Sequence, residues 1–239
     1  MLDPAIFNEN TPLSPFTGKV WRVVESQEQI ATLGLVDNMQ EQGVLESLLD
    51  AVKPPYRSGT EGMHYLLKTA FRYPPLKFGS RFGTRLMPSF LYASLSIKTA
   101  LYETAYYRFL FLEDMQTPYQ KYIDSEHTVF SISINTHKSL NLRVKPFTSL
   151  CKSLLSRDNY SFTQAVGAWA VNDKQVDVIE FESVRLQSNS NVAIAEPSCI
   201  RSRKPLNYQK WICRTTNNVV SFNHYEHDAL TIQKSEVFT

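Results

Sequence analysis

The chain has 239 residues, of which 43% are hydrophobic and 20% charged, a composition typical of a globular protein with a sizeable core. The formal net charge of +2 gives no electrostatic support for nucleic-acid binding, and no apolar run approaches the ~18 residues of a membrane helix. The three cysteines stand at unrelated spacings and predict reduced thiols, and the N-terminus lacks the pattern of a secretory signal. We therefore expect one cytoplasmic domain that binds neither nucleic acid, membrane nor metal.

The first third of the chain predicts an arm, a strand and a helix. Residues 1–20 contain three prolines and few apolar positions, which favours an extended arm. The β-branched and aromatic run Val20–Val24 predicts a short strand. Ser26 with Gln29 forms a capping box, which would start a helix that ends before Pro54. The apolar side chains of residues 64–71 predict a second strand.

The middle of the chain has the clearest periodicity. Residues 96–113 have helical character, because apolar residues recur there at spacings of four, four, four and three: Ile97, Leu101, Ala105, Phe109 and Leu112. Residues 127–135 alternate between apolar and small polar side chains, which predicts a half-buried strand. Residues 140–144 predict a further strand, and residues 146–155 and 162–171 predict short helices.

The last third predicts mainly strands. Residues 176–184 and 191–195 each form an apolar run of strand length. Residues 210–215 and 219–222 flank Asn217-Asn218 and predict a hairpin. The tail after His224 is polar, and we expect it to be less ordered. Together these elements predict a single α+β domain with a helical N-terminal half and a strand-rich C-terminal half.

Several common signatures are absent from the sequence. It contains no GxGxxG, no Walker A loop and no GxSxG elbow. His224 and His227 form a close pair without a matching third ligand, so a solvated tail is favoured over a metal site. The basic and aromatic stretch 201–211 is interpreted as a solvated loop in preference to a nucleic-acid patch.

The stretch from Phe71 to Glu103 concentrates the residues with chemical potential. Arg72-Tyr73 precedes a double proline, and Gly79-Ser80-Arg81-Phe82 stands in a turn-like setting before Tyr92. Arginines beside aromatic rings and a single carboxylate suit a ligand that is anionic at one end, flat at the other and hydroxylated between. A dinucleotide such as NAD has this character.

The same residues carry a resemblance to a known family. FRYPP, GSRFG and LYASLSIKTALYE, followed by DVIEFESVR and NVAIAEP, resemble the RES domain family from about Tyr65 to Pro197. Arg81, Tyr92 and Glu103 are each eleven residues apart, which agrees with the family's pattern. The resemblance implies the toxin of a bacterial toxin–antitoxin pair.

The family also implies a fold and a domain layout. The implied fold is a mixed, split β-sheet core with surrounding helices, similar to that of the ADP-ribosyltransferases related to diphtheria toxin, with NAD in the cleft. On this basis residues 63–239 would form the NAD-cleaving domain. Residues 1–62 would be an N-terminal arm and helical extension packed on that core.

The implied activity is cleavage of NAD at the nicotinamide–ribose bond, by hydrolysis or by phosphorolysis with inorganic phosphate as co-substrate. Two alternatives remain open: transfer of ADP-ribose to a specific cellular protein, and a catalytically silent copy that acts only by binding. The implied partner is an antitoxin with a Cro/Xre-type helix-turn-helix domain, whose C-terminal part covers the cleft in a hetero-oligomer.

The resemblance assigns roles to individual residues. Glu103 would stabilise the positive charge that develops on the ribose when the glycosidic bond breaks. Arg72 and Arg81 would bind the pyrophosphate, because a guanidinium offers paired planar donors, although Arg22 is an alternative match to the family's first arginine. Tyr73 and Tyr92 would flank the nicotinamide ring; a core position is the alternative for each.

The C-terminal motifs add weaker candidates. Ser183 matches the family serine and would either bind the nicotinamide ribose or orient Glu103; a solvent-facing serine is the alternative. Arg185 shares its face of the strand and would be an extra phosphate contact. The segment NSNVAIAEP lacks the glycine that the family has before its asparagine, so ligand contacts from that loop stay open.

Overall fold

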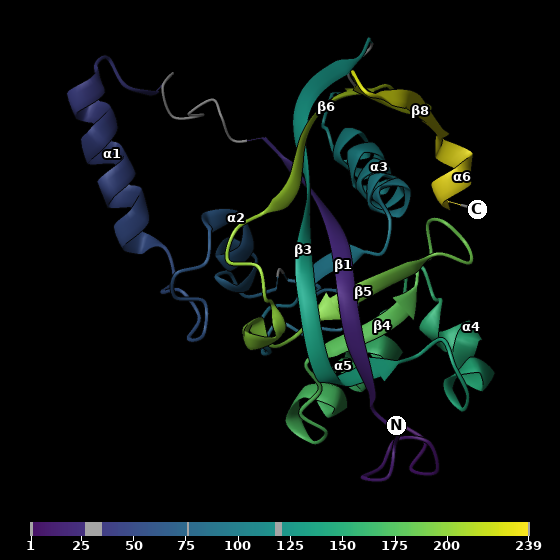
Figure 1. Cartoon of the computed structure of the whole chain (residues 1–239). Helices are drawn as coiled ribbons and strands as arrows, with labels where there is room; N and C mark the ends of the chain where they lie inside the picture. Colours follow the sequence, from purple (N-terminus) through teal and green to yellow (C-terminus); the bar gives the residue numbers. More distant parts are fainter. Residues whose placement is uncertain (1, 27–34, 76, 118–120, 239) are drawn as a thin grey trace.

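The computed structural model describes residues 2–26, 35–75, 77–117 and 121–238 (Figure 1). These residues form a large mixed β-sheet with helices around it, which confirms the predicted α+β class and its split, mixed sheet. The strands are β1 (Ser14–Glu25), β2 (Leu91–Ser94), β3 (Ile123–Asn141), β4 (Val178–Glu182), β5 (Ser190–Ile194), β6 (Leu206–Thr215), β7 (Val219–His224) and β8 (His227–Gln233). The helices are α1 (Met39–Val52), α2 (Tyr65–Lys68), α3 (Ile97–Glu113), α4 (Cys151–Leu154), α5 (Ser161–Asn172) and α6 (Lys234–Phe238), with short 3-10 turns at Thr69–Phe71, Phe147–Leu150 and Pro197–Cys199.

The long strand β3 divides the sheet into two parts. Its residues 123–131 pair with β6, whereas its residues 139–141 pair in parallel with β4. The strand order is β1-β2-β5-β4-β3-β6-β7-β8, and β1 pairs with β3 as well as with β2. Five strands (β1, β2, β5, β4 and β3) therefore close into a ring, and β6, β7 and β8 extend from it as an open arm.

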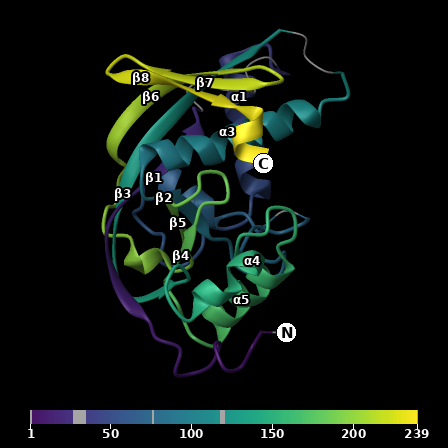
Figure 2. The same ribbon diagram turned by 90° about the vertical axis from the view of Figure 1, so that its right-hand side faces the viewer.

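The helix α3 runs beneath the arm, as Figure 2 shows, and its outer face packs on the arm strands. The predicted helix over 96–113 is confirmed: Ser96 caps it by accepting a hydrogen bond from the Thr99 N–H at 3.1 Å. Its apolar stripe is buried against the arm: Leu101, Ala105 and Phe109. This packing fixes the direction in which the rest of the helix faces the ring.

Most of the predicted strands and short helices are confirmed. The strand over 127–135 lies within β3, and the expected hairpin is formed by β6 and β7. Unlike the half-buried strand that the alternation predicts, both faces of this segment are covered, and Ser131 is as inaccessible as Phe130. The cause is that helices and loops cover one face of this segment of β3, while α3 and the arm strands cover the other face.

Residues 64–71 were predicted as a strand, and this is wrong. They form α2 and a 3-10 turn, begun by the His64 side chain, which accepts from the Leu66 N–H. Only Leu67 and Phe71, four residues apart, are buried. That spacing is helical, but the run of apolar residues at 65–67 conceals it, as short apolar runs often do.

The tail after His224 was expected to be less ordered, and this is also wrong. It forms β8 and α6, and their residues Ile232 and Val237 are completely buried with the outer face of α3. His224 and His227 pair across the β7–β8 turn and lie against the Trp211 ring. The polarity of the tail reflects an arm strand with one solvated face.

The N-terminal part differs from expectation in extent. The predicted strand over 20–24 lengthens into β1, whose residues 14–25 pair along β3 and so belong to the core. Gln29 of the predicted capping box lies outside the described residues; within them, α1 begins after Asn38. The segment 140–144 is not a separate strand, because β3 continues through Asn141 and then turns.

Two further observations concern membrane spans and metal sites. Among the described helices none is both long enough and apolar enough to cross a bilayer. The described ranges hold no group of three His, Cys, Asp or Glu side chains suited to a metal ion, and the three cysteines are free thiols.

The buried His127 makes stability depend on pH. Burial, and then the nearby Arg108 charge, lower the pKa of His127 to about 4, from a usual value of 6.5. The folded protein thus binds this proton less readily than the unfolded chain, so stability is full above pH 6.5 and falls as the pH drops toward 4. We expect a loss of about 3 kcal/mol over that window from this group.

Urea denaturation at pH 7 and pH 4.5 measures this effect. His127→Gln keeps a polar partner for Ser125 but cannot be charged, and should reduce the difference in unfolding free energy between the two pH values. The exposed His137→Gln is the control and should leave that difference unchanged. An unaltered difference in His127→Gln would contradict the assignment.

Candidate active site

A cavity of about 310 Å³ opens where the ring is most weakly closed. The strands β1 and β2 are joined there by a single residue pair, Trp21 with Ser94. The cavity is lined from β1, β2, α3 and the β4–β5 connection, and its polar lining includes Arg22, Arg81, Tyr92, Glu103, Arg185 and Asn191. Its volume lies at the lower end of the range for small-molecule sites.

The Glu103 carboxylate is held by two donors. Its Oε1 accepts from the Ser183 hydroxyl at 2.7 Å and from the Asn191 amide at 2.6 Å. No donor in the described part of the chain reaches Oε2, so this oxygen is left for a ligand in the cavity. Charge-assisted bonds of this kind fix both the position and the rotation of a carboxylate.

The two donors are themselves fixed. The Ser183 hydroxyl oxygen accepts from the backbone N–H groups of Arg185 and Leu186, at 3.2 and 3.1 Å, so its proton points to Glu103. The Asn191 side-chain oxygen accepts from the Ser94 hydroxyl at 2.6 Å, which directs its amide group toward Glu103. Four residues from α3, β2, β5 and the end of β4 thus form one directed chain.

Three guanidinium groups line the cavity: Arg22, Arg81 and Arg185. In the described residues none of the three has a carboxylate within ion-pair distance, whereas Arg72, Arg108 and Arg214 elsewhere each pair with an acid. Glu103 is the only acid among the lining residues that the structure describes. The cavity therefore has an excess of positive charge, which favours an anionic ligand.

Arg22 projects from β1 and is only partly satisfied. Its Nη1 donates to the Tyr92 carbonyl at 2.8 Å, while its Nε is buried and has no hydrogen-bond partner in the described chain. Burial lowers the pKa of Arg22 to about 10, so the group remains charged at neutral pH. A buried donor without a partner carries an energetic cost that a ligand oxygen would relieve.

Arg81 and Arg185 are held by carbonyl groups and aromatic rings. Arg81 donates to the carbonyls of Leu154 and Ser156, at 3.2 and 3.0 Å, and lies 4.7 Å from the centre of the Tyr160 ring. Arg185 donates to a carbonyl of α6, with its guanidinium carbon 3.3 Å from the centre of the Tyr106 ring. Such contacts orient a cation without neutralising it.

Tyr92 lines the cavity and also braces the turn before it. Its hydroxyl oxygen accepts from the Phe82 N–H at 3.0 Å and is hydrogen-bonded to the Ser80 hydroxyl at 2.9 Å. Burial raises the pKa of Tyr92 to about 12, so the phenol stays neutral. Both interpretations of Tyr92, as a site residue and as a packed aromatic, therefore have structural support, since its ring also packs on Phe181.

The turn that carries Arg81 depends on glycine. Gly79 has φ +74°, and a side chain there would lie 2.4 Å from the Gly83 carbonyl and 2.6 Å from the Gln164 amide. A further glycine, Gly167 of α5, lets that helix pack directly on the Phe82 backbone. Gly79 therefore closes this turn against other parts of the protein, the Gly83 carbonyl and the Gln164 side chain.

Arg72 and Tyr73 are not brought to the cavity. Arg72 donates through Nε to the Pro54 carbonyl at 2.6 Å and through Nη1 pairs with Asp50 at 3.2 Å, so its side chain is directed to the end of α1 and the segment that follows it. Tyr73 is half exposed, and its carbonyl accepts from Ser89. Of the two arginines weighed as the first of the family pattern, Arg22 lies at the cavity and Arg72 does not.

Sequence reasoning did not find every lining residue. Asn191 and Ser94 complete the chain of bonds to Glu103, yet Asn191 stood in the segment whose contacts were left open. Tyr107 was also missed, although it stands four residues after Glu103, a spacing that places both side chains on one face of a helix. A second cavity of about 390 Å³ shares Tyr107, Thr104 and Val23 with the first, so the two adjoin.

Comparison with known proteins gives the family. A model of the RES domain matches residues 54–216, well over half of the chain. The chain therefore belongs to the RES domain family, which confirms the resemblance found in its motifs. Among solved structures, a chain in the M. tuberculosis MbcT-MbcA toxin-antitoxin complex is similar, with a TM-score of 0.47 and 11% identity over 93% of this chain and 88% of that chain. No curated protein sequence matches.

The charge of the cavity is testable with a simple anion. Inorganic pyrophosphate should bind the three guanidinium groups and raise the thermal unfolding midpoint. At a hundredfold excess over its Kd, the free energy of unfolding should increase by about 2.7 kcal/mol. Arg22→Met and Arg81→Met should each reduce this shift, measured relative to the same variant without pyrophosphate. Arg201→Met, on the exposed loop before β6, should keep the full shift; equal shifts in all three variants would place the anion elsewhere.

Proposed function

We propose that this protein is the toxin of a bacterial toxin–antitoxin pair and that it depletes NAD by breaking the nicotinamide–ribose bond. The observation that carries the proposal is the composition of one cavity. Among its described residues, three arginines without acidic partners lie beside a single carboxylate, and one oxygen of that carboxylate accepts no hydrogen bond. Membership of the RES family supports it.

The positive and the negative groups of the cavity would contact different parts of NAD. The guanidinium groups of Arg22 and Arg81 would hold the pyrophosphate through paired donors. The carboxylate of Glu103 would lie beside the nicotinamide ribose, with Tyr92 next to the nicotinamide ring. Ser183 then acts on Glu103, because its proton is already given to Oε1, which favours the orienting role over direct ribose binding.

The reaction follows from this placement. The bond between ribose C1′ and the nicotinamide nitrogen breaks with its electron pair leaving on nicotinamide, which becomes neutral. The positive charge that remains on the ribose is stabilised by Glu103, an interaction that strengthens only as the bond lengthens. An oxygen of water or of inorganic phosphate then bonds to C1′, and the attacking group loses a proton to solvent.

The adjoining cavity is the site that we assign to the other half of NAD. Its aromatic residues Tyr107 and Phe111 are four residues apart on α3 and half exposed, so they offer flat apolar faces. The adenine ring would stack there, with Tyr107 at the boundary between the two cavities. An extended dinucleotide would thereby span both.

The antitoxin belongs to the same proposal. A protein that consumes NAD inside its own cell needs an inhibitor, and the open cavity is the surface that an inhibitor would have to cover. We assign this role to an antitoxin with a Cro/Xre-type helix-turn-helix domain, as the family implies, so that the toxin is held in a hetero-oligomer until it is released.

The central test is NAD consumption by the purified chain. Glu103→Gln keeps the size of the side chain and removes its charge, and should lower turnover at least a hundredfold. Glu113→Gln, on the same helix but outside both cavities, should retain full turnover. Chromatography with and without inorganic phosphate identifies the product, ADP-ribose or its 1″-phosphate. NAD loss that persists in Glu103→Gln would rule out this mechanism.

The place of the adenosine half has a separate test. Phe111→Ser should raise the KM for NAD at least fivefold, since stacking of a base on an aromatic ring contributes about 1–3 kcal/mol. It should leave kcat/KM for nicotinamide mononucleotide unchanged, because that substrate has the same bond and no adenosine. Tyr225→Ser at the β7–β8 turn is the matched control. Equal effects on the two substrates would exclude an adenine site at Phe111.

A further inference from the structure

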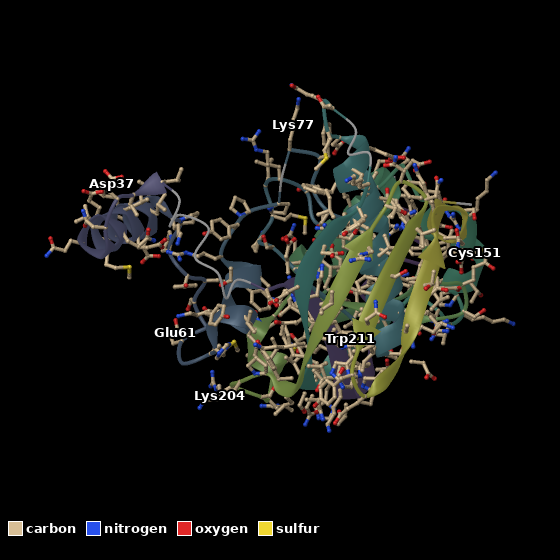
Figure 3. The ribbon with its side chains drawn as sticks, turned by 90° about the horizontal axis from the view of Figure 1, so that it is seen from above. Asp37, Glu61, Lys77, Cys151, Lys204 and Trp211 are labelled. Atoms are coloured by element: carbon tan, nitrogen blue, oxygen red, sulfur yellow. The ribbon has the colours of Figure 1, made fainter. Side chains whose placement is uncertain are left out.

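The helix α1 stands away from the rest of the molecule, as Figures 1 and 3 show, with Asp37 beside its outer end. It precedes residues 54–216 and is therefore not part of the segment that matches the family. Within the described ranges no helix or strand packs along its length. Its C-terminal end is attached through Asp50, which pairs with Arg72, and one residue within the helix, Gln42, is buried.

The N-terminus of this helix is well capped, but the helix is too short to be stable alone. The Asn38 side chain accepts from the N–H groups of Gln40 and Glu41, at 3.0 and 2.9 Å, and its amide donates to the Glu41 carboxylate at 2.8 Å. The helix nevertheless has only 14 residues, a length at which isolated helices are marginal in water. An apolar contact along its side is what such a helix requires.

One side of α1 offers this contact. Val44, Leu48 and Val52 follow one another at intervals of four and are 61%, 62% and 81% exposed. Helical spacing places them on one face. A groove of about 420 Å³ is lined by the first two of them, Val44 and Leu48, and includes Leu45 and Glu41. Exposed apolar side chains gathered in this way mark interaction surfaces.

The charge on α1 selects the kind of partner. Residues 37–52 contain four acids and no lysine or arginine, so the remainder of the chain has an excess of six positive charges. Asp37 and Glu41 continue the stripe toward the N-terminal end, at spacings of four and three before Val44. Two copies of α1 packed together would oppose acids to acids, which disfavours helix-to-helix pairing of this chain with itself.

We propose that α1 is a docking surface for a basic amphipathic helix of a partner protein. The apolar face of that helix would cover Val44, Leu48 and Val52, and its lysines or arginines would lie opposite Asp37 and Glu41. This is the helix-in-groove mode of recognition, with charge giving the specificity.

Arg72 fixes the orientation of α1, and with it the orientation of the docking surface. Its side chain is only 8% exposed, bonds both Asp50 and the Pro54 carbonyl, and lies 4.2 Å from the centre of the Tyr56 ring. It therefore clamps the end of α1 to the segment before α2. A helix that is already oriented loses less freedom on binding.

Two synthetic peptides of 18 residues provide the test. Both place leucine at i, i+3, i+4 and i+7; one has lysine at the remaining positions and the other glutamate. Fluorescence anisotropy with the full chain should show the lysine peptide binding at least tenfold more tightly than the glutamate peptide. The double change Val44→Ser with Leu48→Ser should weaken the lysine peptide at least tenfold, and Val144→Ser, an exposed apolar site elsewhere, should not.

The remaining outcomes also decide the proposal. Asp37→Asn with Glu41→Gln should weaken the lysine peptide and flatten its salt dependence. Equal affinity for both peptides, or binding that survives the changes at Val44 and Leu48, would overturn the proposal. So would a dimer in light scattering that Leu48→Ser dissociates, because the face would then join two copies. Circular dichroism confirms that each variant is folded. None of these measurements involves NAD, so they stand apart from the proposed activity.

Discussion

The carboxylate of Glu103 is the point at which α3 is tied to the strands of the ring. A partly buried charge needs donors, and here they come from the end of β4 and from β5, at 2.7 and 2.6 Å. The outer face of α3 is meanwhile fixed on the arm. These two attachments set the width of the space between helix and ring, and that space is the cavity.

The arginines around this carboxylate follow a consistent pattern. Arg22, Arg81 and Arg185 are oriented by backbone carbonyls and aromatic faces, which leave their charge intact. Arginines that serve the fold, such as Arg108 and Arg72, pair with acids. Positive charge maintained without an acidic partner in a half-closed space costs stability, and it is retained where an anion is to be bound.

The position of Arg72 could not be predicted from the residues next to it in the sequence. Next to Tyr73 and two prolines Arg72 looks like a ligand residue, whereas Arg22, in the middle of a strand, was only the alternative match to the family's first arginine. Their roles differ because β1 runs along β3 past the cavity, whereas Arg72 turns toward the end of α1. Both arrangements join residues far apart in sequence, and neither has a signature in the residues themselves. The order Arg81, Tyr92, Glu103 and Ser183 was recovered only through the family pattern.

The sequence by itself determined what short-range physics controls. The stripe and cap of α3, the alternation within β3 and the β6–β7 turn are local, since neighbours along the chain decide them. Tertiary structure alone decided that 64–71 is helical and that the polar tail forms an ordered edge of the sheet. It also decided that Asn191 and Ser94 complete the hydrogen bonds of Glu103. The contacts of the site join residues 80 or more apart in sequence, and those of the tail join it to the distant helix α3, so neither leaves a periodic trace in the chain. For 64–71 the helical spacing of Leu67 and Phe71 is present, but only their burial distinguishes them from their apolar neighbours.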